Sequence, residues 1–192
     1  SSPPQGWLGF PDNFLTSGIC WICYAERDHY DKAMTPKPTG KAINTKAILE
    51  FICDEVTRQG WDLATEDGFR RVMWMIDAWD YALMWQDEAF CEEHLLAIAG
   101  IVEKVKNQKG YRAVGVRVGS RICPQAKEVP ELIKRLFENR HSLTPDEFYV
   151  RFQEVHPFVD GNGRTGKILH NWLLGTLHNP VLIKDYFGGG NP

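Results

Sequence analysis

The chain has 192 residues, of which 43% are hydrophobic and 24% are charged. A chain of this length is suited to one domain with a packed core, and its composition excludes a largely disordered protein. Its formal net charge of -3 excludes the basic excess that drives binding to phosphate backbones, so we expect no nucleic-acid partner.

Hydropathy and cysteine usage bear on the compartment. The apolar stretch 19–25 is among the longest in the chain, and it is far shorter than the roughly 20 residues of a membrane helix. The chain does not open on a basic segment followed by an apolar one, as a secretory signal does. The five cysteines are an odd, scattered set, which suits a reducing compartment. We therefore expect no membrane partner and a cytoplasmic location, in the producing cell or in a host cell to which the protein is delivered.

Proline and glycine divide the chain into an arm, a domain and a tail. The stretch "MTPKPTGK" at 34–41 predicts that residues 1–40 are an N-terminal arm and linker. Residues 41–187 are then expected to form one domain, and the "GGGNP" end at 188–192 a flexible tail.

Helix signals are regular in the first part of the domain. A first helix is predicted from a cap at Thr45, with apolar residues at helical spacing, to Gly60. A second helix is predicted over residues 65–85, where acidic residues follow the cap. A third is predicted from Asp87 to a basic turn at about residue 106.

The stretch "YRAVGVRVGSRI" changes this pattern to a period of two. Valine alternates there with glycine and arginine, at Val114, Gly115, Val116, Arg117 and Val118. This alternation predicts a short β-hairpin. Further helices are predicted from Pro130, from Thr144 into His156, and after the glycines that follow. The predicted fold class is therefore mainly α, with one small β-hairpin.

The stretch "HPFVDGNGRTGKI" at 156–168 gathers residues suited to a nucleotide. Glycines on both sides of Asn162 allow close approach to a ligand, and the next helix offers unpaired N–H groups and its positive dipole end. These features predict a phosphate site. Asp160 lies at its mouth, where a carboxylate tolerates phosphate only with a hard cation such as Mg²⁺ between them.

His156 is the candidate general base, because its ordinary pKa is close to neutral and it can take a proton from a hydroxyl. Arg164 and Lys167 are expected on one face of the helix, where both can meet phosphate oxygens. Each feature alone is more often structural, and it is their clustering that favours a site. Neither the Walker phosphate loop nor the dinucleotide fingerprint is present.

The same stretch resembles the signature of the Fic family in the Fic/Doc superfamily, H-P-F-x-[D/E]-G-N-G-R-x-x-R, at every fixed position but the last. "GYRAVGVRV" is similar to the Fic segment that leads into a flap hairpin, and "CPQAKEVPELIKRLFE" to the segment that leaves it. The resemblance covers residues 101–182. It implies a Fic-like helical bundle in which the hairpin is the flap.

The resemblance also implies roles for single residues. His156 would deprotonate a target hydroxyl, Phe158 would anchor the loop, and Asp160 would hold Mg²⁺. The nucleotide phosphates would lie against Gly161, Asn162, Gly163, Arg164 and Lys167. The flap would bind a segment of the target protein as an extra strand.

A typical member of the family transfers AMP from ATP to a Tyr, Ser or Thr hydroxyl of another protein, and often of itself. The resemblance therefore implies a protein adenylyltransferase. Its substrate would be ATP, its cofactor Mg²⁺, and its partner a target protein with an exposed hydroxyl residue.

Lys167 departs from the family, which has arginine at this position. Lysine keeps the charge but lacks the two-pronged geometry that orients a terminal phosphate. The alternatives are slower transfer, a different nucleotide, or a reversed nucleotide that gives phosphate transfer, as in Doc-type relatives. A degenerate fold that binds only nucleotide or a partner is a further alternative, although His156 and Asp160 are intact.

Many Fic proteins inhibit themselves with a helix of the pattern [S/T]-x-x-x-E-[G/N], whose glutamate pairs with that last arginine. No good copy of this pattern follows Thr45, Thr65 or Ser142, so we expect no intramolecular brake. A small antitoxin-like partner or a segment before the first residue would supply the glutamate, unless regulation is absent.

Overall fold

A computed structural model describes residues 42–183 of the chain. The arm predicted for residues 1–40 and the tail predicted for 188–192 lie outside the described residues. The division of the chain into arm, domain and tail therefore stays a prediction.

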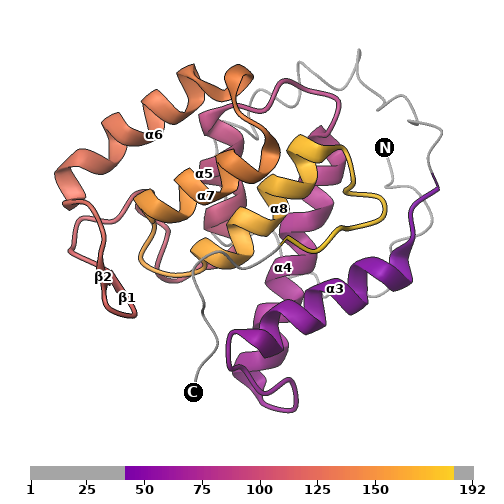
Figure 1. Ribbon diagram of the computed structural model, residues 1–192. Coiled ribbons are helices and arrows are strands. Elements are labelled where there is room, and N and C mark those ends of the chain that lie inside the picture. Colours follow the sequence, from indigo (N-terminus) through magenta and orange to yellow (C-terminus); the bar gives the residue numbers. More distant parts are fainter. Residues whose placement is uncertain (1–41, 184–192) are drawn as a thin grey trace, which may run out of the picture. The chain divides into compact units, whose positions relative to one another are not determined.

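The described part contains six α-helices and a two-stranded sheet (Figure 1). The helices are α3 (Thr45–Arg58), α4 (Glu66–Trp85), α5 (Glu92–Val102), α6 (Val129–Glu138), α7 (Pro145–Val155) and α8 (Asn162–Leu174). Two 3₁₀-helices, η2 (Ala126–Glu128) and η3 (Arg140–Ser142), precede α6 and α7. The expectation of a mainly α fold with a small hairpin is confirmed.

Helix α8 is the most buried element of this part of the chain, and it packs against α7, α5 and α4 (Figure 1). Gly166 permits the close contact with α7, because a Cβ there would lie 2.3 Å from Gln153 Nε2 and 2.9 Å from the Tyr149 ring. Every residue of α8 from Arg164 to Trp172 is buried. The helix that follows the motif loop is therefore enclosed by the core.

Two helices begin at the predicted caps. Thr65 accepts a hydrogen bond from the Gly68 N–H at 3.1 Å, and Thr144 forms a reciprocal capping box with Glu147 at the start of α7. These caps involve residues three positions apart, so the local sequence is enough to predict them.

The cap of α3 was predicted one residue too late. Asn44, not Thr45, caps this helix, and its Oδ1 accepts from the Ala47 N–H at 3.1 Å. The Asn44 N–H also donates to the carbonyl of His178 at 2.9 Å, which holds Asn44 outside the helix. This contact joins distant parts of the chain, so the local pattern could not reveal it.

Helix α5 is shorter than predicted at both ends. It begins at Glu92 rather than Asp87, because Phe90 turns into the core and interrupts the helix there. It ends at Val102, before the predicted basic turn. Glu103 leaves the helical conformation (φ -142), and its carboxylate meets two buried arginines.

The hairpin consists of β1 (Arg117–Val118) and β2 (Arg121–Ile122), which pair antiparallel. It is shorter than the alternation from Val114 predicts. The Val114 carbonyl accepts from the Arg112 side chain at 2.8 Å, so it is held outside the ladder.

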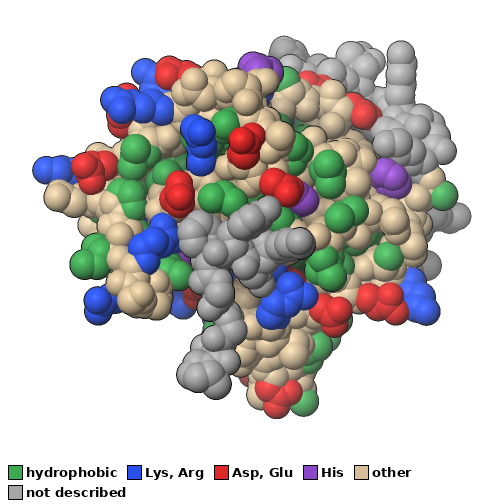
Figure 2. Space-filling view, viewed as in Figure 1, with side chains coloured by type: hydrophobic (Ala, Val, Ile, Leu, Met, Phe, Trp, Pro, Cys, Tyr) green, Lys and Arg blue, Asp and Glu red, His purple; other side chains and the backbone are tan. Residues whose placement is uncertain are grey.

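The surface is mixed in charge. Figure 2 shows basic and acidic side chains interspersed over the viewed face, with apolar side chains between them. Large apolar side chains such as Phe69, Met84 and Ile122 are exposed. No helix within residues 42–183 is long and apolar enough to cross a bilayer.

Candidate functional site

The predicted site residues meet where α7 ends and α8 begins. Helix α7 ends at Val155, and His156 follows as its C-cap in a left-handed conformation (φ 50). Among the non-glycine residues of 42–183, His156 is the one with positive φ. Such a conformation is rare for a residue with a side chain, and it turns the chain sharply into the loop.

The surroundings of His156 keep its imidazole neutral. Burial is the main cause that lowers its pKa, the positive charge of Arg121 lowers it further, and the pKa is about 4. The imidazole is therefore unprotonated at neutral pH. In that state it can accept a proton from a hydroxyl group.

Asn162 fixes the loop between His156 and α8. Its side-chain oxygen accepts from the Phe158 N–H, and its side-chain nitrogen donates to the Phe158 carbonyl, both at 2.9 Å. Phe158 is fully buried and packs against the rings of Tyr111 and Phe152. The Asn162 side chain thus closes the loop, and phosphate would have to bind to the backbone here.

Gly161 and Gly163 leave room at the start of α8. Gly161 has φ 74, and a Cβ there would lie 2.9 Å from Val102 Cγ1, so this position requires glycine. A Cβ on Gly163 would lie 3.0 Å from Gln59 Nε2, so the side chain of the residue that follows α3 borders the first turn. The first N–H groups of α8 lack intrahelical acceptors, and this end of the helix attracts anions.

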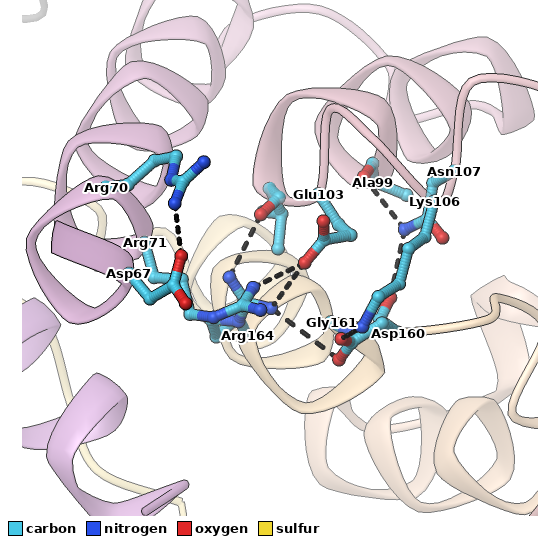
Figure 3. A network of polar contacts seen from close by, with 11 residues as sticks. Asp67, Arg70, Arg71, Ala99, Glu103, Lys106, Asn107, Asp160, Gly161 and Arg164 are labelled. Atoms are coloured by element: carbon cyan, nitrogen blue, oxygen red, sulfur yellow. Dashed lines mark hydrogen bonds and ion pairs between the residues drawn. The ribbon is translucent and has the colours of Figure 1, made fainter. Parts of the chain in front are cut away.

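Asp160 is an ionised carboxylate at the edge of this turn (Figure 3). Burial opposes its ionisation, but hydrogen bonds from Lys106 and from the Gly161 N–H lower its pKa overall. The Lys106 Nζ lies 2.5 Å from one carboxylate oxygen, and the Gly161 nitrogen lies 2.6 Å from the other. Asp160 is 28% exposed, so it is accessible from solvent.

The donor set around Asp160 fits Mg²⁺ bound together with a nucleotide. No cluster of three or more His, Cys, Asp or Glu side chains that could hold a metal occurs within residues 42–183. Mg²⁺ commonly takes one or two protein carboxylates and completes its shell with phosphate and water. Asp160 would be that carboxylate, and in this structure it forms an ion pair with Lys106.

Arg164 is fully buried and bonded to the protein interior (Figure 3). Its Nη1 donates to the Val102 carbonyl at 3.0 Å, and its Nη2 lies 3.4 Å from Glu103 Oε2. The same Nη2 lies 3.7 Å from Asp160, and Arg71 shares the Glu103 carboxylate at 2.5 Å. Arg164 therefore supports the loop from behind, and it has no exposed surface with which to meet a phosphate in this state.

Lys167 is also buried, and its partner is a carboxylate. Its Nζ donates to Glu55 Oε2 at 2.7 Å, and the two side chains are 2% and 3% exposed. Gln59 donates to the same Glu55 side chain at 2.9 Å. The search for the inhibitory pattern found no good copy, yet the structure pairs this cation with a carboxylate of the chain itself, Glu55 on α3. Its neighbours Phe51 and Val56 depart from the Ser/Thr and Gly/Asn of the inhibitory pattern.

The predicted flap residues lie before and on the first strand. Arg117 and Val118 form β1, while Val114, Gly115 and Val116 precede it. Val114, Gly115 and Arg117 are exposed, and Val116 and Val118 are half-buried. The sheet has two strands, so each keeps one edge without a strand partner within the described residues.

Sequence reasoning missed the residues that hold the site together. Glu55, Glu103 and Lys106 each pair with a motif residue, and Arg112 and Arg121 bond the end of α7. The motif itself contains no signal for these partners. The cations Arg164 and Lys167 each require a carboxylate partner if they are buried. The sequence offers many acidic residues and no means of choosing among them.

Comparisons with known proteins follow the same loop and helices. The Fic/DOC family model matches residues 89–174. The chain is 26% identical to the "Protein adenylyltransferase Fic" of Drosophila mojavensis and 27% identical to that of Drosophila sechellia, in each case over 157 residues. These alignments cover 72% of this chain but 29% and 30% of the relatives. The chain thus spans less than a third of the length of the curated relatives that it matches.

Solved structures share the fold. A Fic family protein from Desulfovibrio desulfuricans G20 superposes with a TM-score of 0.58 at 18% identity, covering 83% of this chain and 57% of that one. A Fic domain containing signaling protein from Bacteroides thetaiotaomicron VPI-5482 gives a TM-score of 0.57 at 17% identity, covering 69% and 64%. The comparisons agree: residues 89–174 match the Fic/DOC family, the relatives are similar to this chain over 157 residues, and the described part shares the fold of Fic proteins.

Proposed function

We propose that this protein transfers AMP from ATP to a Tyr, Ser or Thr hydroxyl of a target protein, and to itself. The observation that carries the proposal is one loop that brings together a neutral histidine, an ionised aspartate and the first turn of α8. The curated relatives named protein adenylyltransferase support the choice of AMP as the group transferred.

His156 acts as the general base in this proposal. Its neutral imidazole takes the proton from the target hydroxyl. The hydroxyl oxygen then forms a bond to the α-phosphorus of ATP, and the bond from that phosphorus to the bridging oxygen breaks. Pyrophosphate leaves with the electron pair of that bond.

The start of α8 binds the phosphates. The N–H groups at Asn162 and Gly163 lie in the first turn, where the helix dipole favours negative charge. Asp160 would hold Mg²⁺, which when bound supplies positive charge against the phosphate oxygens. Lys106 has to leave Asp160 for this to occur, and an exposed lysine can move at little cost in free energy.

The hairpin is the surface that we propose for the target. The partly exposed segment from Val114 to Val118 offers an edge to which a segment of the target protein adds as a strand. Such binding depends on backbone hydrogen bonds, so it can present the hydroxyl of Tyr, Ser or Thr residues.

Glu55 acts as an internal inhibitor in this scheme. Lys167 stands where the family has the arginine that orients the terminal phosphate, and Glu55 pairs with it. We therefore assign the inhibitory carboxylate to this chain rather than to a separate small partner. ATP would bind productively only when α3 withdraws Glu55 from Lys167.

Two other functions are separated from AMP transfer by the product. A Doc-like phosphotransferase would add phosphate, and a binding module would add nothing. Both alternatives stay open because Lys167 lacks the planar, two-pronged guanidinium of arginine.

The test is intact-protein mass spectrometry after incubation with ATP and Mg²⁺. We expect a gain of AMP in the wild-type protein and in His141→Ala, which changes an exposed histidine away from the loop. We expect no gain in His156→Ala, although that variant stays folded and binds ATP. Equal modification of His156→Ala would contradict the proposal, and a gain of phosphate would favour the Doc-like reaction.

A further inference from the structure

The C-terminal end of α7 is held by two arginine side chains. The last carbonyls of a helix lack intrahelical donors. Arg121 donates from Nη2 to the Gln153 carbonyl at 2.8 Å and from Nη1 to the Glu154 carbonyl at 3.0 Å. Arg112 donates from Nη2 to the Val155 carbonyl at 3.3 Å. It also donates from Nε to the carbonyl of His156 at 2.8 Å, so the two arginines together bond the backbone up to the histidine itself.

Arg112 bonds both ends of the hairpin as well. Its Nη1 donates to the Val114 carbonyl at 2.8 Å, where the chain enters the hairpin. Its Nη2 donates to the Pro124 carbonyl at 2.7 Å, where the chain leaves it. The side chain is 3% exposed, and its backbone N–H donates to Pro157 at 2.9 Å. Arg112 therefore connects the hairpin to Val155 and His156 through its guanidinium, and to Pro157 through its backbone N–H.

Arg121 makes the same connection from the hairpin itself. It lies on β2, opposite Val118 of β1, and its side chain reaches back to α7. The hairpin lies beside the end of α7 in Figure 1. A displacement of this strand would therefore pull on the carbonyls directly before His156.

We propose that Arg112 and Arg121 are positioning residues that lock the His156 base to the target-binding hairpin. The role rests on the proposed function of His156 and of the hairpin. A target segment bound along the hairpin then meets the imidazole in one fixed geometry, and the left-handed backbone of His156 is held in place by side chains on the hairpin side. Fixed geometry between a base and its substrate is a large part of a catalytic rate.

The charges of the two arginines add an effect on the histidine. Burial lowers the pKa of His156 most, and Arg121 and then Arg112 lower it, while Asp160 and a hydrogen bond with the Gln153 backbone raise it. Removal of the Arg121 charge should therefore raise the pKa of His156. A simple helix cap would contribute to folding stability but would not couple the hairpin to the protonation of the base.

The primary test is Arg121→Gln, with Arg151→Gln as the matched control. Arg121 is half-buried, so its replacement is tolerated better than that of buried Arg112. Arg151 is an exposed arginine on α7 and carries the same charge. His156 is titrated by NMR in both variants, and its signal is assigned from its loss in His156→Ala. Transfer to a target protein is measured as a function of pH.

We expect Arg121→Gln to raise the pKa of His156 and to move the acid limb of the transfer rate to higher pH. We expect kcat/KM for the target to fall by roughly tenfold while KM for ATP stays unchanged. Arg151→Gln should alter none of these. An unchanged titration together with unchanged target kinetics, even with a lower melting temperature, would reduce Arg121 to a helix cap and overturn the inference.

A second variant separates charge from geometry. Arg121→Lys keeps the charge but cannot donate to two carbonyls in a fixed fork. We expect its His156 pKa to stay low while kcat/KM for the target still falls, and normal target kinetics would overturn the positioning role. The NMR titration does not require activity. Absence of AMP transfer by the wild-type protein would thus refute the proposed function, and the titration would then decide separately whether Arg121 acts on His156.

Discussion

Two buried ion pairs, Arg164–Glu103 and Lys167–Glu55, surround the same turn of α8 but are built from different parts of the chain. Glu103 follows α5 and lies within the segment that the Fic/DOC family model matches. Glu55 lies on α3, outside that segment. Arg164 also bonds the Val102 carbonyl, and Glu103 also holds Arg71.

We propose that the first pair builds the site and that the second closes it. Glu103 is held by two arginines from different helices, so it cannot leave without exposing two buried charges. Glu55 pairs with one buried cation, Lys167, and with the exposed Arg58 at 3.5 Å. In the proposed scheme the first pair serves structure and the second serves regulation, because withdrawal of Glu55 would uncover one buried cation and withdrawal of Glu103 would uncover two.

Replacement of Glu103 should have the largest effect, and that effect is a lower free energy of unfolding of the protein. Glu103→Gln keeps the shape of the side chain but removes the counter-charge that Arg71 and Arg164 share in the core, and Arg164 keeps the more distant Asp160 carboxylate at 3.7 Å. We expect a loss of about 3–5 kcal/mol in the free energy of unfolding. Urea denaturation measures it, with exposed Glu93→Gln on α5 as the control. A loss below about 1 kcal/mol would mean that Glu103 does not build the site.

Removal of the Lys167–Glu55 pair should increase activity rather than reduce it. Glu55→Gln should raise ATP affinity and transfer by about tenfold, because the charge-assisted bond to Lys167 no longer has to break. The accompanying loss of stability should be about 1–3 kcal/mol, less than for Glu103, because Glu55 serves one buried cation and Glu103 serves two.

Calorimetric ATP binding and AMP transfer would be compared in Glu55→Gln and in Glu50→Gln, an exposed position on the same helix. Equal ATP affinity in wild type and Glu55→Gln would show that both buried pairs are structural. The proposed difference between the two pairs would then be wrong.

A third pair, Lys106–Asp160, extends the comparison to the surface. Lys106 is 46% exposed, so its bond to Asp160 is worth less than either buried pair. Lys106→Met should lower the Mg²⁺ concentration for half-maximal transfer by about two- to fivefold, because the metal no longer displaces an ammonium group. A higher Mg²⁺ requirement in this variant would instead assign Lys106 to the phosphates.

The smallest effect is expected for Lys167→Arg. The residue that pairs with Glu55 keeps its positive charge, and arginine restores the two-pronged guanidinium that the family has at this position. We expect the rate of AMP transfer to stay the same or to rise by no more than about threefold, which corresponds to less than about 1 kcal/mol in activation free energy. A switch to phosphate transfer or to another nucleotide, detected by mass spectrometry, would show that lysine selects a different nucleotide geometry.

Local signals predicted much of the fold correctly. The cap at Thr65 and the capping box at Thr144 and Glu147 depend on residues close in the chain, and both are present. The start of α5 was wrong because Phe90 is drawn into the core by residues far away in the chain, including Phe137 and Phe148. A periodic pattern cannot show which apolar residue will leave a helix to fill the core.

The same limit explains what was missed at the site. The sequence pattern placed His156 and Asp160 in one loop with glycines beside them, because these residues are neighbours in the chain. It could not identify Glu55 as the partner of Lys167, because that contact depends on how α3 packs against α8. The letters around Glu55 depart from the inhibitory pattern, so a search by pattern fails even though the carboxylate is present.

The sequence by itself determined the resemblance to the Fic/Doc family, the mainly helical class and the grouping of polar residues in the motif loop, because these depend on short-range spacing, helical periodicity and the freedom of glycine. Only the tertiary structure decided which charges meet. It placed Glu103 behind Arg164, Glu55 on Lys167, and Arg112 and Arg121 at the end of α7. Those partners come from elements far apart in the chain, and a buried charge is stable only where packing brings such a partner to it.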